Sequence, residues 1–343
     1  MSASRRPWMK WNPSNRRADQ AVQSCSLAAR GLWLEMLGLM HERSFPAGEI
    51  VPFASKRSAG RRIDHGEQSL EARTLDPESV QGFDLALFSA GSSISREWAP
   101  RFVESGCVVI DNSSAWRMDE NVPLVVAEIT PAELDRHRGI VANPNCSTIQ
   151  MVMALKPIHD AAGIERVVVS TYQSTSGTGQ QAVDELRDQT SAVLETKDIE
   201  PSVYPHQIAF NILPQVEVFE DGDDYTTEER KMMAETCKIL GDDSIALSVT
   251  CARVPVYNGH SESINVQTRE ELSPERCREL LDAFPGVVVV DEPSQGRYPM
   301  PIDAAGRDEV LVGRVRRDPS HERCLNLWVV ADNLRKGAAT NTV

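Results

Sequence analysis

The chain has 343 residues, 41% hydrophobic and 25% charged, with a net charge of −14. This composition is that of an ordinary globular protein, and the length favours two domains. The acidic balance argues against a general affinity for nucleic acid or anionic membranes. No apolar run is long enough to span a membrane, no signal peptide is evident, and the seven cysteines include no CxxC pair. We expect a reduced, cytoplasmic protein without a metal site.

The first forty residues differ from the rest of the chain. The spacing of the apolar residues predicts one helix over residues 24–41, which Ser26 can cap. The residues before it show no convincing strand. We therefore treat 1–42 as an atypical N-terminal segment.

From residue 43 onward the pattern is that of an α/β protein. Short apolar strands are predicted at 50–54, 85–90 and 107–110. Each of them runs into a loop of small or polar residues, and helical stretches lie between them. This arrangement is typical of a parallel sheet with ligand-binding loops at the ends of its strands. Residues 43–142, with the C-terminal 332–343, are expected to form this domain.

The pattern changes after residue 142. Helices are predicted at 149–158, 180–192, 226–240 and 333–339, the last returning to the first domain. Strands are predicted at 166–172, 245–256, 263–267, 286–290, 310–316 and 324–331. We expect a second α+β domain over 143–331, with a more antiparallel sheet.

Cys146 stands in the turn Asn143-Pro144-Asn145-Cys146-Ser147-Thr148, between an apolar run and a helical segment. Pro144 and the asparagines favour the turn, and capping residues favour a helix start. The positive end of the helix dipole would then favour a thiolate, which is the nucleophilic form. A small buried cysteine at a turn is the alternative interpretation.

Ten motifs in order make the chain from about residue 43 to 339 resemble the aspartate-semialdehyde dehydrogenase family. They are ERSFP (42–46), SKRSAG (55–60), SAGSSIS (89–95), IDNSSAWRM (110–118), NPNCST (143–148), YQSTSGTG (172–179), YPHQIAFNILPQ (204–215), ETCKIL (235–240), ARVPVYNGHSE (252–262) and VVADNLRKGAA (329–339). The resemblance implies a Rossmann-like NADP-binding domain and an α+β catalytic and dimerisation domain.

The resemblance also implies a reaction. The family reduces β-aspartyl phosphate to aspartate semialdehyde with NADPH and releases phosphate, on the route to lysine, threonine, methionine and isoleucine. Cys146 matches the family's nucleophile, which forms a thioester that a hydride can reduce. His260 matches its acid–base residue, and Gln173 matches the glutamine beside the thioester.

Cationic residues suit a doubly anionic substrate. By the resemblance, Arg253 would bind the amino-acid carboxylate as a bidentate fork, while Arg117 and Lys238 would bind the phosphate. Glu235 would meet the substrate ammonium or order its neighbours. Taken alone, Glu235 and Lys238 are three residues apart on one face of a helix, and the pattern then favours an ordinary solvated salt bridge.

The cofactor residues implied by the resemblance fall into four places. They are Arg57 and Ser58 for the 2′-phosphate of NADP, Gly91 on the adenosine side, Ser176 and Gly177 beside the nicotinamide, and Asn333 for the nicotinamide amide. We expect NADP as the cofactor, small-molecule substrates as partners, and a homodimer or homotetramer.

The front of the chain departs from the family. The family begins with a strand and a GATGAVG loop that cradles the pyrophosphate, but its three glycine positions here fall on Leu27, Arg30 and Trp33. The first βα unit is therefore expected to be replaced, by a fusion or by a wrong gene start. Two alternatives follow: a catalytically impaired paralogue, or an enzyme like N-acetyl-glutamyl-phosphate reductase.

Overall fold

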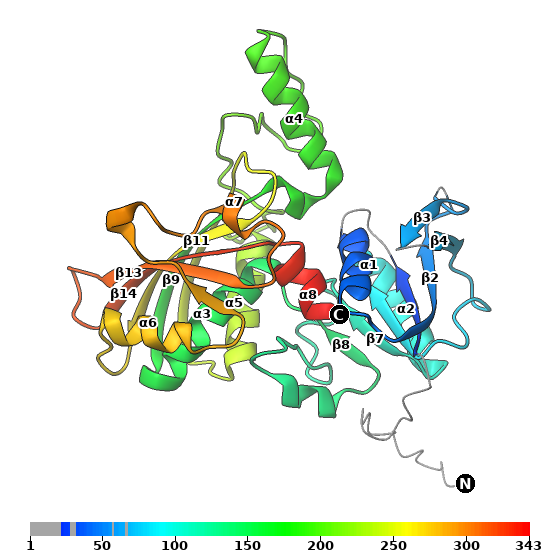
Figure 1. The fold of residues 1–343 in the computed structure, drawn as a ribbon, viewed down its shortest axis with the longest axis horizontal. Helices are drawn as coiled ribbons and strands as arrows, with labels where there is room; N and C mark the ends of the chain where they lie inside the picture. The colour runs from blue at the N-terminus through cyan, green and yellow to red at the C-terminus, as the bar shows by residue number, and fades with distance from the viewer. Residues whose placement is uncertain (1–21, 28–31, 57, 66–67) are drawn as a thin grey trace.

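The computed structural model describes residues 22–27, 32–56, 58–65 and 68–343, which form two bodies, each built on a six-stranded sheet (Figure 1). The first sheet has the order β5-β2-β1-β6-β7-β8, and all its strand pairs are parallel. Its strands are β1 (Val22–Leu27), β2 (Ala47–Ala54), β5 (Arg73–Thr74), β6 (Leu85–Phe88), β7 (Val108–Asp111) and β8 (Ile140–Ala142). The three strands predicted here are confirmed as β2, β6 and β7.

The second sheet is mixed, with the order β10-β9-β11-β14-β13-β12. Its central pairs β9–β11, β11–β14 and β13–β14 are antiparallel, and the outer pairs β9–β10 and β12–β13 are parallel. The strands are β9 (Ile164–Gln173), β10 (Ala246–Arg253), β11 (His260–Thr268), β12 (Val287–Val289), β13 (Val310–Arg317) and β14 (Cys324–Ala331). The predicted second sheet is confirmed.

Helices cover the sheets, and one projects away from them. The α-helices are α1 (Leu32–Glu42), α2 (Ser92–Glu104), α3 (Cys146–Ala162), α4 (Gln180–Leu194), α5 (Thr227–Leu240), α6 (Pro274–Asp282), α7 (Pro301–Ala304) and α8 (Thr340–Thr342). Shorter elements are a hairpin, β3 (Arg62–His65) and β4 (Gln68–Glu71), the 3₁₀ turns η2 (Pro131–Arg136), η3 (Thr175–Thr178) and η4 (Pro293–Gln295), and the π-helix η5 (Arg335–Ala339). Helix α4 forms an arm above the second sheet (Figure 1). No helix among the described residues is long and apolar enough to cross a membrane.

The N-terminal prediction was wrong. Residues 22–27 form β1, a central strand paired with β2 on one side and β6 on the other, and the helix begins only at Leu32. The strand β1 and the helix α1 thus form a first βα unit, and both belong to the first body. The sequence VQSCSL has little strand character of its own, so the two flanking apolar strands decide its conformation. The loop positions 28–31, including Arg30, lie outside the described residues.

The first sheet has a separate apolar layer on each face. Along β6, Ala86 and Phe88 pack with the side chains of α2, while Leu87 packs with those of α1. Trp33 belongs to the α1 layer and is only 4% exposed. Its indole therefore lies in the core and is held by packing.

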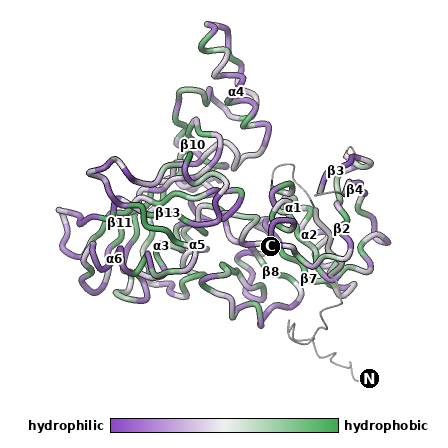
Figure 2. The backbone as a smooth tube through the Cα atoms, in the orientation of Figure 1, coloured by the Kyte–Doolittle hydropathy of each residue, from purple (hydrophilic) through white to green (hydrophobic). Residues whose placement is uncertain are grey.

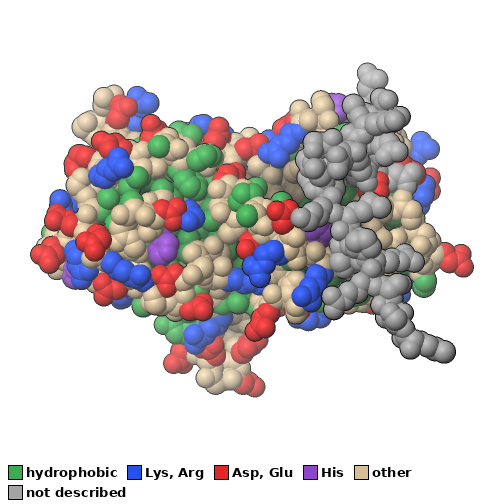
Figure 3. Space-filling view, turned by 90° about the horizontal axis from the view of Figure 1, so that it is seen from below, with side chains coloured by type: hydrophobic (Ala, Val, Ile, Leu, Met, Phe, Trp, Pro, Cys, Tyr) green, Lys and Arg blue, Asp and Glu red, His purple; other side chains and the backbone are tan. Residues whose placement is uncertain are grey.

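Helix α3 is the centre of the largest core. Its residues from Ile149 to Leu155 are buried all round, because the second sheet, α5 and α6 surround it. Hydrophobic residues accordingly concentrate along the inner strands and hydrophilic residues along the outer loops (Figure 2). On the face seen from below, acidic and basic side chains are interspersed over both bodies (Figure 3). The packing around α3 fixes the position of its N-terminus, where Cys146 lies.

The C-terminal segment ties the two bodies together. After β14, Arg335 bonds Glu35 (3.1 Å) and Glu42 (2.8 Å) of α1, and Asp308 (2.9 Å) of the second body. Ala339 packs in the α1 layer. The helix predicted over 333–339 is observed as the π-helix η5, which is followed by one short turn of α-helix, α8.

The buried indole gives a stability prediction. Trp33→Ala should lower the free energy of unfolding by about 3–5 kcal/mol, because it leaves a large cavity in the α1 layer. Leu34→Ala is the matched control, since Leu34 on the same helix is 53% exposed and should change it by less than about 0.5 kcal/mol. Denaturant titration of both variants measures the difference. Equal losses of unfolding free energy in Trp33→Ala and Leu34→Ala would contradict the burial of Trp33 in the core.

Candidate active site

A pocket of about 870 Å³ lies between the two bodies. It is reached by the ends of β9 and β10, the start of α3, the loop after β7 and the C-terminal segment. Seven of the residues predicted from the sequence line it: Arg117, Cys146, Gln173, Ser176, Gly177, Arg253 and Asn333. Residues more than 200 positions apart in sequence, such as Arg117 and Asn333, therefore meet at one cavity.

Cys146 is the first residue of α3 and is half-buried in the pocket wall. The Oδ1 of Asn145 caps the helix by accepting from the N–H groups of Ser147 (2.9 Å) and Thr148 (3.2 Å). The position predicted from the turn sequence is confirmed. The cap fixes the sulfur at a helix N-terminus that opens into the pocket.

The surroundings of the Cys146 thiol disfavour the thiolate. Burial, together with the nearby carboxylate of Glu228, raises the pKa of Cys146 to about 12. Arg253 and Arg117 act in the opposite direction but do not prevail. The helix-dipole effect predicted from the sequence is thus opposed by desolvation of the sulfur, which has the larger effect on its pKa.

His260 is fully buried behind Gly177, with its Nε2 unpartnered. Its Nδ1 accepts the backbone N–H of Ser174 (3.0 Å), so the neutral ring carries its proton on Nε2. Burial and the charge of Arg253 hold the pKa of His260 well below its usual range. No hydrogen bond joins this ring to the Cys146 sulfur within the described part of the chain. As it stands, the imidazole is neutral and is a proton donor at Nε2.

Gly177 is required by close packing. A Cβ at this position would lie 3.0 Å from Nη1 of Arg253 and 3.1 Å from Nε2 of His260. The missing side chain therefore lets these two groups approach the pocket together. Arg253, at the end of β10, is 5% exposed, donates from Nη1 to the Ser174 carbonyl (2.7 Å) and keeps a buried, unpartnered Nε.

Glu228 is a pocket residue that the sequence analysis missed. It is 3% exposed, and its carboxylate accepts from Asn145 Nδ2 (2.9 Å) and Gln173 Nε2 (3.1 Å). Burial raises its pKa. The signal was present but ambiguous, because α5 carries the pattern ExxK twice: Glu228 with Lys231, and Glu235 with Lys238.

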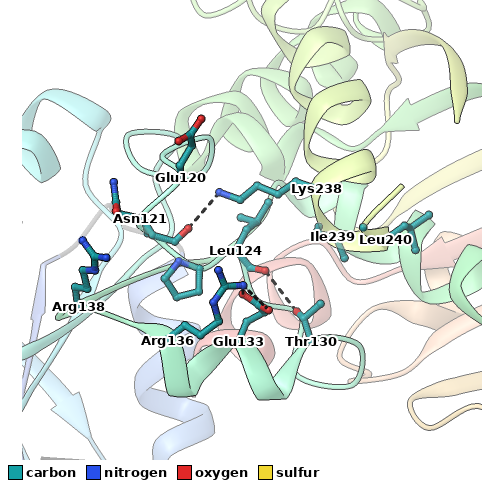
Figure 4. Close-up of a pocket in the computed structure, with 13 residues that line it drawn as sticks. Glu120, Asn121, Leu124, Thr130, Glu133, Arg136, Arg138, Lys238, Ile239 and Leu240 are labelled. Carbon is teal, nitrogen blue, oxygen red and sulfur yellow. Dashed lines mark hydrogen bonds and ion pairs between the residues drawn. The ribbon is translucent and has the colours of Figure 1, made fainter. Parts of the chain in front are cut away.

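The second of these pairs does not line the pocket. Glu235 is 1% exposed and bonds Arg117 Nη1 (3.0 Å) and the Asn145 N–H (2.7 Å). Lys238 faces a different cavity, of about 510 Å³, shown in Figure 4. The structure therefore brings Arg117 to the site but not Lys238.

The cofactor residues are partly brought together. Asn333 is buried, and its Oδ1 accepts from Ser174 Oγ (2.9 Å) and Ser176 Oγ (3.2 Å), which places these residues beside Gly177. Ser58 and Gly91 lie in the loops after β2 and β6, at the carboxyl edge of the first sheet, and neither lines the pocket. Arg57 lies outside the described residues.

Gly337 is a second residue that the sequence analysis did not single out. A Cβ at this position would lie 2.8 Å from the Cβ of Cys146. The π-helix η5 thus packs directly on the candidate nucleophile. The sequence contained the motif RKGAA but gave no sign of this contact.

Comparison with known proteins shows the family to which the chain belongs. Family models match residues 33–137 (semialdehyde dehydrogenase, NAD binding domain) and 155–336 (semialdehyde dehydrogenase, dimerisation domain). Aspartate-semialdehyde dehydrogenase of Aquifex aeolicus (strain VF5) is 56% identical over 90% of this chain and 91% of its own length. That of Bacillus subtilis (strain 168) is 48% identical over 90% and 91%. The chain belongs to the aspartate-semialdehyde dehydrogenase family.

Solved structures of the family share the fold. Aspartate semialdehyde dehydrogenase II from Vibrio cholerae superposes with a TM-score of 0.89 at 45% identity, covering 94% of this chain and 96% of that one. The same enzyme is also known complexed with ASA. The enzyme with NADP from Candida albicans, at 23% identity and a TM-score of 0.71, shows the fold alone. The chain is thus a member of an oxidoreductase family with a nicotinamide-dinucleotide-binding domain, and the comparisons favour neither alternative.

The charge of Glu228 gives a prediction for this dehydrogenase-family site. That charge raises the pKa of Cys146, so Glu228→Gln should lower it and increase the thiolate fraction between pH 7 and 9. We expect Cys146 to be alkylated about three- to tenfold faster, since one pKa unit is a tenfold change. Peptide mass spectrometry after iodoacetamide treatment measures the rate. Glu120→Gln, away from the pocket, is the control, and an unchanged rate in Glu228→Gln would contradict the assignment.

Proposed function

We propose that the chain catalyses the NADPH-dependent reductive dephosphorylation of β-aspartyl phosphate to aspartate semialdehyde. The observation that carries the proposal is the single pocket that holds Cys146, Gln173 and Arg253 beside Arg117 and Glu228. This set contains a nucleophile, an amide donor, two cations and one anion. It suits an acyl phosphate that also bears a carboxylate and an ammonium. Relatives up to 56% identical carry the same enzyme name.

For each charged group of the substrate, the pocket offers a side chain of opposite charge. Arg253, with its unpartnered Nε, would bind the carboxylate, and the buried Glu228 would meet the ammonium. Arg117 would bind the phosphate. An ammonium beside Glu228 would offset the charge that raises the pKa of Cys146, so substrate binding itself would favour the thiolate.

Cys146 would attack the acyl carbonyl, form a thioester and expel phosphate. The Nε2 proton of His260 would be given to the oxygen that becomes negatively charged when the thioester is reduced. The complementary role, as base for the thiol, needs the other tautomer. In that tautomer Nδ1–H would donate to Ser174 Oγ, which lies 3.0 Å away and can donate in turn to Asn333.

NADPH would supply the hydride, and the residues present fit one end of this cofactor better than the other. Near the thiol, Ser176, Gly177 and Asn333 line the pocket and would hold the nicotinamide end of the cofactor. At the pyrophosphate end, the sequence offers side chains at 27, 30 and 33 where three glycines would serve. We propose that 22–142 and 332–343 bind the cofactor, and that 143–331 hold the thiol and substrate.

We also propose a homodimer formed through the second body. Large apolar side chains are exposed on the arm and on the loops beside it: Leu194, Phe210, Ile212, Val218, Phe219, Tyr257 and Ile302, each at least 48% exposed. Exposed apolar surface of this kind marks an interaction site. The matching dimerisation model covers the same body.

Replacing the nucleophile tests the proposed reaction. Cys146→Ser should abolish phosphate-dependent oxidation of aspartate semialdehyde, followed by NADPH absorbance, because a hydroxyl forms the anion far less readily than a thiol. Cys277→Ser is the control, since this cysteine is buried in the core far from the pocket. Near-normal turnover by Cys146→Ser would exclude the mechanism.

The front of the chain gives a second prediction. Leu27→Gly with Arg30→Gly should tighten NADPH binding at least about tenfold, or 1.4 kcal/mol, because glycines let backbone N–H groups approach the pyrophosphate. Trp33 is left in place because it is part of the core. Fluorescence titration measures the change. If the unaltered chain already binds NADPH at low-micromolar concentration, the cradle residues are not limiting.

A further inference from the structure

Helix α4 forms an arm above the second sheet (Figure 1), yet the side chains of its buried face hold a segment of the pocket wall. This segment is residues 202–209, the wall loop. We propose that α4 holds the wall loop so that Tyr204 fixes the guanidinium of Arg253 for the carboxylate end of the substrate. Tyr204 is then a positioning residue for one end of the substrate, and the inference rests on the proposed function for its kinetic readout.

Glu185 of α4 holds the start of the wall loop. Its carboxylate accepts from the backbone N–H (3.1 Å) and the Oγ (2.6 Å) of Ser202 and from the backbone N–H of Val203. Its other oxygen accepts from Gln189 Nε2 (2.9 Å). Glu185 is only 7% exposed, and a buried carboxylate requires hydrogen bonds of this kind. Removal of Glu185 therefore leaves the backbone donors of the wall loop without an acceptor.

Gln189, one helical turn after Glu185, holds the end of the same loop. Its Oε1 accepts from the backbone N–H groups of Ile208 (2.8 Å) and Ala209 (3.2 Å). Between the two polar residues, Leu186 packs with Ile208 and Ala209 in a small apolar cluster. The buried face of α4 thus fixes both ends of the wall loop, and the residues between them line the pocket.

Tyr204 lies in the wall loop beside Arg253. The centroid of its ring is 6.0 Å from Arg253 Cζ. Its hydroxyl donates to Thr178 Oγ1 (3.0 Å), and burial raises the pKa of Tyr204, which keeps that proton in place. Thr178 ends the turn that begins after Ser174, whose carbonyl accepts from Arg253 Nη1 (2.7 Å). Arg253 is therefore held by the turn through a hydrogen bond and by the wall loop through the ring.

A ring restrains a guanidinium without using its donors. Arg253 has five N–H donors, of which Nη1 bonds Ser174 and Nε is buried without a partner. The face of an aromatic ring attracts the cation through its quadrupole and accepts no conventional hydrogen bond. Tyr204 thus limits the movement of the Arg253 side chain and leaves its fork free for a carboxylate.

The first test replaces Tyr204 and measures the KM for aspartate semialdehyde, phosphate and NADP⁺. Tyr204→Leu should raise the semialdehyde KM about tenfold, because the ring beside Arg253 is lost, and change the other two by less than about twofold. Tyr204→Phe keeps the ring and loses only the hydrogen bond to Thr178, so its rise should be less than about threefold. Tyr298→Leu is the control, since Tyr298 is exposed and does not line the pocket.

The second test separates α4 from the wall loop. Glu185→Ala should raise the semialdehyde KM about five- to tenfold and speed hydrogen exchange of the amides at 202–209. Asp188→Ala is the control, because Asp188 lies on the same helix and is exposed. Since Glu185 acts through Tyr204, the double variant should have a semialdehyde KM within about twofold of that of Tyr204→Leu.

An unchanged semialdehyde KM in Tyr204→Leu would overturn the proposal, as would an equal rise of all three KM values or fully multiplicative effects in the double variant. Should Tyr204→Leu fail to fold, Tyr204→Met takes its place with the same expectations. Lack of activity in the unaltered chain would refute the proposed function alone. Modification of Arg253 by phenylglyoxal, followed by peptide mass spectrometry, needs no turnover. It should be at least about threefold faster in Tyr204→Leu than in the unaltered chain, and equal rates would overturn the role of Tyr204.

Discussion

One buried carboxylate sets the geometry of the site. Glu235 accepts hydrogen bonds from the Arg117 guanidinium and from the backbone at Asn145, so it couples the loop after β7 to the helix that begins at Cys146. An ion pair this deeply buried is weak evidence for net stability, because desolvation offsets much of the attraction. Its value lies in fixing where two loops meet, and removal of either partner would leave an uncompensated charge.

The electrostatics of the pocket are incomplete without substrate. Burial and Glu228 raise the pKa of Cys146, while burial and Arg253 lower that of His260, so both groups are neutral near pH 7. A cation bound beside Glu228 would lower the pKa of Cys146 and so favour the thiolate. A site arranged in this way would keep its thiol from reacting with unrelated electrophiles.

Close backbone approach is the second constraint. Gly337 brings the C-terminal π-helix onto Cys146, and Gly177 lets Arg253 and His260 share one wall. The same C-terminal segment carries Arg335, which bonds acidic residues of both bodies. The nucleophile therefore lies where the two bodies meet, so any change in their relative position would be felt at the sulfur.

The sequence by itself determined the strands with strong apolar character, the helix start at Cys146 and the meeting of Gln173, Gly177 and Arg253, because local propensities and ordered motifs encode them. Only the tertiary structure decided three other points. Residues 22–27 became a strand because β2 and β6 flank them, against weak local preference. Of two identical ExxK patterns on α5, packing selected Glu228 for the pocket and left Lys238 behind it. The thiol stayed neutral because burial, which depends on contacts distant in sequence, outweighed a helix dipole that depends on local ones.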